Sequence, residues 1–158
     1  MRLINVCKAT PTSAVDSEGL AKILELFSVS KQGYKLTPAA ADRIAWSSPA
    51  GLIYGSASNT KEGHRIMHVL AHTVVDYKVG PGITHSVFTG ARDELFQLLD
   101  EAWSSTAKVH PLNDQGFEIA NQWVVPMGRV IGTDGQQKIF LVMRRAGSAE
   151  ILTAHPIH

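Results

Sequence analysis

The stretch that decides the predicted fold is WVVPMGRVIGTDGQQKIFLVMRRAGSAEILTAHPIH, residues 123–158. Its β-branched and apolar residues recur with a period of two, which is typical of β-strands. Two hairpin turn signals, Thr133-Asp134-Gly135 and Ala146-Gly147-Ser148, divide the stretch. It therefore predicts a three-stranded antiparallel meander, with strands near residues 123–131, 137–145 and 149–155.

The residues before the meander carry helical patterns instead. The clearest is ARDELFQLLDEAWSS, residues 91–105, which places one apolar face on a helix. KEGHRIMHVLAHT, residues 61–73, has the same period. Further helices are expected over residues 16–31 and, behind a Thr37 cap with Pro38 at the first helical position, over residues 37–46.

A short strand is expected at residues 52–54, in an otherwise loop-like segment that follows the second of these helices. Helices that precede a meander define an α+β fold. We expect the N-terminal helices to pack on a twisted antiparallel sheet that the C-terminal meander mainly forms.

Composition limits the class of protein. With 158 residues, 44% of them hydrophobic, the chain suits one globular domain, at most with an N-terminal extension. No apolar run reaches the roughly 18 residues that cross a bilayer, and no signal peptide is apparent, so we expect no membrane contact. Cys7 is the only cysteine, which excludes an intramolecular disulfide and a thiolate-rich zinc site. The net charge of +1 argues against a strongly basic, nonspecific binder of nucleic acid.

Histidines cluster in the middle of the chain. His64, His68 and His72 lie within GHRIMHVLAHT, and His85 follows within THSVF. An imidazole, with its unperturbed pKa of about 6.5, gives or takes a proton near neutrality. The cluster is compatible with acid/base chemistry, with a metal site, or with a non-catalytic interaction module in which the histidines only pack.

The metal alternative is a hydrolase that uses the HxxxH helix. Side chains four residues apart on a helix point the same way, so His64 with His68, or His68 with His72, can share a metal. His72 lies about 12 Å further along the helix than His64, so all three cannot bind one ion. Residue 65 is arginine where the HExxH motif has its catalytic glutamate. We expect no metal ligands and no cofactor.

Proton transfer accounts for the pattern better. Metal-independent RNA cleavage needs a base for the ribose 2′-OH, an acid for the leaving 5′ oxygen, and donors for the phosphorane charge. His68 or His72, together with His85, are the candidate acid/base groups. Thr153 is the candidate phosphate donor at the catalytic centre. The candidate cations that hold RNA phosphates are on the meander: Arg129, Lys138 and Arg144, the last two with Arg145 as a positive patch at one end of the sheet.

The order GHRIMHVLAHT, THSVF, DELFQLLDEAW, then VVPMGRVIGTDG, KIFLVMR and SAEILTAHP resembles a known group of domains. These are the C-terminal toxin domains of contact-dependent inhibition and other polymorphic toxin systems, in particular the ribonuclease group of barnase, bacterial EndoU, colicin-type nucleases and RelE. The resemblance spans residues 61–158. It implies helices packed on a twisted sheet whose concave face holds an RNA phosphate, with Thr153 and His155 as phosphate contacts.

The resemblance also implies the biology. Residues 61–158 become a ribonuclease-like toxin domain, and residues 1–60 an N-terminal helical entry or linker region. Such a domain acts on RNA in the cytoplasm of the target cell after secretion or cell-surface delivery within a larger toxin. Its expected partners are its RNA substrate and a cognate immunity protein, and we expect it to be a monomer when free.

Overall fold

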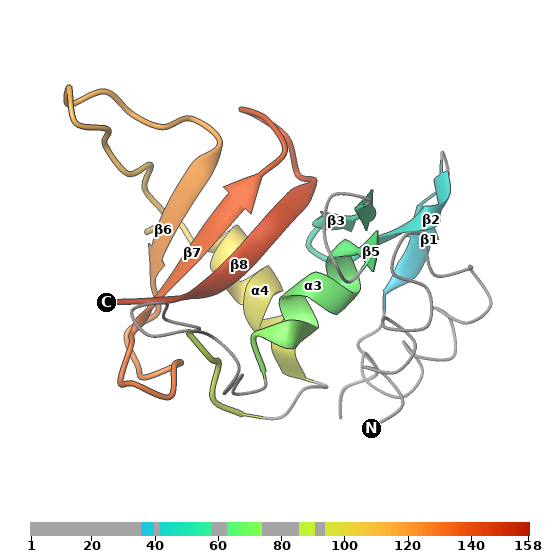
Figure 1. Ribbon diagram of the computed structural model, residues 1–158, viewed down its shortest axis with the longest axis horizontal. Helices are drawn as coiled ribbons and strands as arrows, with labels where there is room; N and C mark the ends of the chain where they lie inside the picture. The colour runs from blue at the N-terminus through green and yellow to red at the C-terminus, as the bar shows by residue number, and fades with distance from the viewer. Residues whose placement is uncertain (1–35, 40–41, 58–62, 74–85, 91–93) are drawn as a thin grey trace.

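The computed structural model describes residues 36–39, 42–57, 63–73, 86–90 and 94–158 (Figure 1). These residues form two α-helices and three antiparallel sheets, so the protein has a mixed α+β fold. No helix in this part of the chain is long and apolar enough to span a bilayer.

The C-terminal sheet is the meander that the period of two predicts. Its strands are β6 (Gln122–Pro126), β7 (Lys138–Met143) and β8 (Ile151–Ile157), hydrogen-bonded in that order. β6 ends earlier than expected, and Gly128 just beyond it has a φ of 71°, a conformation that leaves the β region and that glycine adopts at no steric cost.

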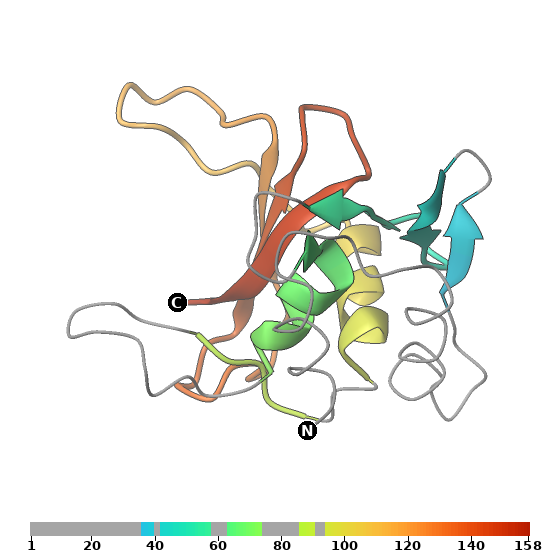
Figure 2. The same cartoon turned by 45° about the vertical axis from the view of Figure 1, so that its right-hand side comes forward.

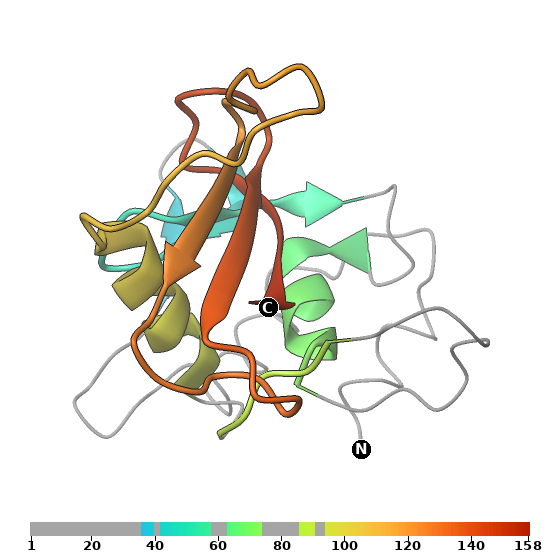
Figure 3. The same cartoon turned by 90° about the vertical axis from the view of Figure 1, so that its left-hand side faces the viewer.

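Two helices pack against this sheet. α4 (Leu95–Ser104) lies behind it, and α3 (Arg65–Ala71) lies beside β8 (Figures 1 and 3). Along β7 every second residue is buried, because alternate side chains point to opposite faces and one face is covered. The covered face contributes Ile139, Leu141 and Met143 to the same hydrophobic core as α4. The other face carries the half-buried or exposed side chains.

Residues 37–39 and 42–46 are strands and not the helix that the sequence predicts over residues 37–46. They form β1 (Thr37–Ala39) and β2 (Asp42–Ser47), which continue into a sheet with β3 (Ile53–Tyr54). Trp46 pairs with Tyr54 across this sheet, and both side chains are buried. The Thr37-Pro38 capping signal is local, and tertiary pairing with burial overrides such a preference.

The strand expected at residues 52–54 is present as β3, whereas the helix expected over residues 16–31 lies outside the described residues. A small sheet of β4 (Ser56–Ala57) and β5 (Gly63–His64) leads into α3 (Figure 2).

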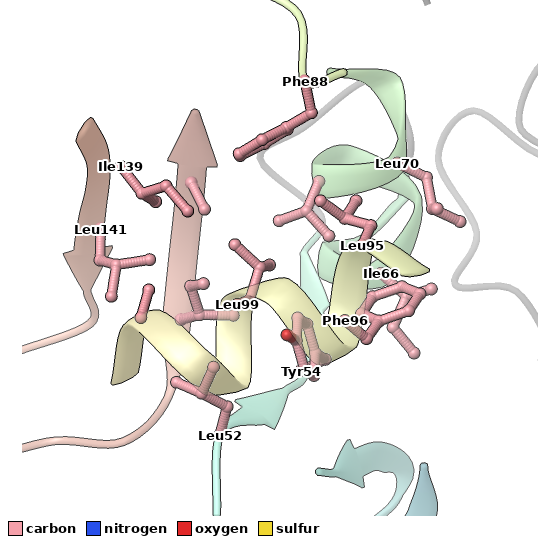
Figure 4. Packing of buried hydrophobic residues seen from close by; sticks show 14 of the residues in the cluster. Leu52, Tyr54, Ile66, Leu70, Phe88, Leu95, Phe96, Leu99, Ile139 and Leu141 are labelled. Atoms are coloured by element: carbon pink, nitrogen blue, oxygen red, sulfur yellow. The ribbon is translucent and has the colours of Figure 1, made fainter. Parts of the chain in front are cut away.

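One core joins the segments before and after residue 60. Leu52 and Tyr54 belong to the same buried cluster as Ile66, Phe96 and the sheet residues (Figure 4). The Tyr54 and Phe96 rings meet edge to face, with centroids 5.2 Å apart. The domain boundary at residue 60 stays a prediction, and the described residues on its two sides share this core.

Candidate active site

α3 begins at a histidine that caps it. His64 is the N-cap residue, and its Nδ1 accepts a hydrogen bond from the Ile66 backbone N–H at 3.2 Å. Its side chain is fully buried. A capping acceptor satisfies one of the backbone donors that a helix leaves unpaired at its start, so this histidine has a structural role. The geometry therefore counts against the alternative in which His64 and His68 hold a metal together.

His68, in the last turn of α3, and His72, the C-cap residue of that helix, lie one turn apart. The His68 and His72 ring centroids are 5.8 Å apart with the rings nearly perpendicular. Both side chains are half-buried. The HxxxH spacing brings them together because residues i and i+4 share one helix face.

β8 supplies the facing groups. Thr153 and His155 are two residues apart, so they project from the same face of the strand. The Thr153 hydroxyl lies 3.0 Å from His68 Nε2, and the His155 ring stacks on His72 with centroids 5.4 Å apart. These four side chains, His68, His72, Thr153 and His155, form what we call the histidine cluster.

A buried arginine holds α3 against β8. Arg65, the first residue of α3, donates from Nη1 to the Leu152 carbonyl at 3.0 Å. Leu152 directly precedes Thr153, so this contact sets the position of the helix relative to the strand that completes the cluster. Sequence reasoning used Arg65 only to reject the HExxH motif, and it missed this role.

Ser86 contacts two of the imidazoles. Its backbone carbonyl lies 3.0 Å from His72 Nδ1, and its hydroxyl lies 3.2 Å from His155 Nδ1. A carbonyl only accepts, so His72 donates from Nδ1, and in the neutral ring the lone pair is on Nε2. Sequence reasoning missed Ser86, and a lone serine carries no signal that would have singled it out.

The histidine cluster borders the face of the C-terminal sheet opposite to the one that contributes Ile139, Leu141 and Met143 to the core, and we call it the open sheet face. Phe140 is directly opposite His155 in the β7–β8 register, with ring centroids 5.4 Å apart. Lys138 is two residues before Phe140 on the same face and is exposed. No carboxylate stands among the strand residues of this face, which are Gln122, Val124, Pro126, Lys138, Phe140, Val142, Thr153, His155 and Ile157. The face suits an anionic ligand.

Two of the predicted phosphate-binding cations lie elsewhere. Arg129 makes a two-pronged ion pair with Glu101 of α4, at 2.7 and 2.9 Å. It follows β6, which is separated from β8 by β7, so it lies about 10 Å or more from the cluster. Arg144 follows the end of β7 and lies 3.3 Å from Glu150.

The positive patch expected from Lys138 and Arg144 together does not form. Lys138 begins β7 and Arg144 follows its last residue, so about 20 Å of extended chain separates them. The two cations therefore lie at opposite ends of β7. The structure thus brings His68, His72, Thr153 and His155 together and leaves Arg129 and Arg144 outside the cluster, whereas His85 lies outside the described residues.

The Arg129–Glu101 pair contributes little to folding. The hydrogen bond from Arg129 lowers the pKa of Glu101, and the hydrogen bond to Glu101 raises the pKa of Arg129. Both side chains are about half exposed, so solvent screens the pair. We expect Arg129→Ala to lower the free energy of unfolding by at most about 1 kcal/mol, measured by urea denaturation at pH 7.

The sign of the pH effect follows from the lowered pKa of Glu101. Its contribution is present above the unfolded carboxyl pKa of about 4.3 and is lost as the pH falls through the folded value. Wild type and Arg129→Ala should therefore differ at pH 7 and converge in strong acid. A loss at pH 7 well above 1 kcal/mol contradicts the screened geometry.

Two further observations bear on the chemistry. Among the described residues, no group of three histidine, cysteine or carboxylate side chains is arranged to hold a metal ion. Comparison of the chain with protein-family models, with curated proteins and with solved structures finds no match in any of the three. The geometry of the histidine cluster is therefore the basis for a functional proposal.

Proposed function

We propose that this protein is a metal-independent endoribonuclease toxin that cleaves RNA by acid/base transphosphorylation. The observation that carries the proposal is the meeting of His68 and His72 from α3 with Thr153 and His155 from β8. The His72 ring lies within about 6 Å of the His68 and His155 rings, beside the Thr153 hydroxyl, on a face whose strand residues include no carboxylate. Such a set of groups meets the needs of phosphodiester cleavage.

His72 is the proposed base. Its Nδ1–H is directed to the Ser86 carbonyl, so the lone pair of the neutral ring is on Nε2. An imidazole oriented by an acceptor at one nitrogen and active at the other is a recurrent arrangement in hydrolases. Nε2 takes the proton of the ribose 2′-OH as its oxygen attacks phosphorus.

His155 is the proposed acid. As the bond from phosphorus to O2′ forms, the bond to O5′ breaks, and a protonated His155 gives its proton to O5′. The products are a 2′,3′-cyclic phosphate and a 5′-hydroxyl. His68 Nε2 lies 3.0 Å from the Thr153 hydroxyl, and in the proposed step Nε2–H donates to Thr153 Oγ1 while the Thr153 hydroxyl donates to a nonbridging oxygen of the phosphorane.

The arrangement of the elements supports the toxin interpretation. The resemblance implies helices on a twisted sheet with an RNA phosphate on its concave face, and here α4 covers one face while the cluster borders the other. Delivery within a larger toxin, action in the target cytoplasm, neutralisation by a cognate immunity protein and a monomeric free state belong to the same proposal. No cofactor is part of it.

RNA cleavage in the presence of EDTA tests the proposal. We expect the purified protein to cut a labelled single-stranded RNA in EDTA and to leave 2′,3′-cyclic phosphate ends, because no step needs a metal. The ends are identified by resistance to phosphatase before, and sensitivity after, acid opening of the cyclic ester.

The other outcomes separate the alternatives. Cleavage that appears only with added divalent metal favours a metal-dependent hydrolase and overturns the proposal. Absence of cleavage, together with normal growth of cells that express the chain alone, favours a non-catalytic module. A histidine outside the cluster provides a control variant, His110→Ala, which should cleave RNA like wild type. His110 stacks on Trp123 with ring centroids 3.7 Å apart and donates to the Gln122 carbonyl, away from β8.

A further inference from the structure

Phe140 stands at the centre of the open sheet face. It lies in β7, the middle strand, with Val124 opposite it on β6 and His155 opposite it on β8. Its side chain is half-buried, whereas its neighbours Ile139 and Leu141 are fully buried on the other face. The core is therefore built without this ring.

Its surroundings combine an aromatic surface with positive charge. The Phe140 ring meets the proposed acid His155 at a centroid distance of 5.4 Å and an interplanar angle of 58°. The exposed Lys138 lies two residues along the strand, about 7 Å away. A ligand that is anionic at one point and flat and apolar next to it is complementary to this surface.

We propose that Phe140 is a stacking platform for a nucleobase of single-stranded RNA, next to the scissile phosphate. The inference rests on the proposed function, because the phosphate that places the base is the one bound by the histidine cluster. Every base has a π-face, so an aromatic platform binds RNA without selecting its sequence. Paired bases are stacked within a duplex, so the platform favours unpaired RNA. Lys138 holds the phosphate on the far side of that nucleotide.

Binding of an uncleavable RNA tests the platform separately from catalysis. The probe is a fluorescent 2′-O-methyl oligoribonucleotide, which lacks the attacking hydroxyl, and the readout is fluorescence anisotropy. We expect Phe140→Ala to raise the Kd about 5- to 100-fold, the range for loss of one stacking aromatic. Phe140→Tyr should bind like wild type, because it keeps the ring.

Two controls make the result specific. Phe117→Ala removes an equally large aromatic side chain that is 70% exposed on the loop between α4 and β6, and it should leave the Kd unchanged. An oligonucleotide of the same length with abasic positions should bind wild type and Phe140→Ala alike.

Circular dichroism establishes that each variant is folded. A further variant, Phe140→Leu, replaces the ring with an apolar side chain that has no π-face.

The outcomes decide the proposal. An unchanged Kd for folded Phe140→Ala or Phe140→Leu overturns the platform while leaving cleavage intact. A raised Kd in a protein that never cleaves RNA supports the platform and removes the catalytic proposal. A change of oligomeric state in Phe140→Ala, seen by light scattering, assigns this face to a second copy of the chain and overturns the platform. Failure of wild type to bind the probe also overturns it.

Discussion

Replacing His72 with alanine is expected to slow RNA cleavage by about 10²- to 10⁴-fold, the usual contribution of a positioned general base. The reason is geometric, because the bond from His72 Nδ1 to the Ser86 carbonyl places the lone pair of the neutral ring on Nε2, and the ring stacks on His155. The rate is measured under single-turnover conditions, where product release does not interfere. Growth arrest on expression should be relieved in parallel.

The pH profile distinguishes a catalytic from a structural effect of His72. A base and an acid that act together make kcat/KM bell-shaped in pH, and loss of the base removes the acidic limb. His110→Ala is the matched histidine control, and it should keep both the cleavage rate and the bell-shaped pH dependence of kcat/KM. If His72→Ala cleaves as fast as wild type, His72 is not the base; if its rate falls but both limbs remain, the histidine only supports the fold.

Replacing Phe96 with alanine is expected to lower the free energy of unfolding by about 3–5 kcal/mol, as for other fully buried phenylalanines. Phe96 has no exposed surface and packs edge to face on Tyr54, at the centre of the shared core. Its removal leaves a cavity between α4 and the segment that carries β3 (Figure 4). Urea denaturation with an unchanged m-value gives the difference directly.

Phe117→Ala is the control for Phe96→Ala. Phe117 is 70% exposed, so its truncation should change the free energy of unfolding by no more than about 0.5 kcal/mol. A loss of less than 1 kcal/mol in Phe96→Ala would mean that α4 does not pack against β3 as described. Comparable losses in the two variants would contradict the burial difference between the two phenylalanines.

The local sequence pattern was enough to predict the strands of the C-terminal meander and the helix α4. The meander follows from a period of two with turn signals such as Ala146-Gly147-Ser148, and its strands pair with their neighbours in the sequence, across connections of eleven residues between β6 and β7 and seven between β7 and β8. α4 follows from an apolar face that begins at Leu95. The local pattern did not predict β1 and β2, where a helix was expected over residues 37–46. β2 is a strand because Trp46 pairs with Tyr54 of β3, and no capping signal near Thr37 anticipates that pairing.

The candidate site shows the same division. Sequence reasoning singled out His68, His72, Thr153 and His155 by residue type and resemblance, and these four meet. It also grouped Lys138 with Arg144, which a strand holds about 20 Å apart. Charge type is visible in a sequence, but separation in space depends on which strand end a residue occupies.

The sequence by itself determined the α+β class, the C-terminal meander and the pool of histidines from which the site is drawn, because periodicity and residue chemistry are local properties. Only the tertiary structure decided that Ser86 orients His72 and that α3 faces β8. Those contacts join residues up to 87 positions apart, as Arg65 with Leu152, and packing of the shared core brings them together.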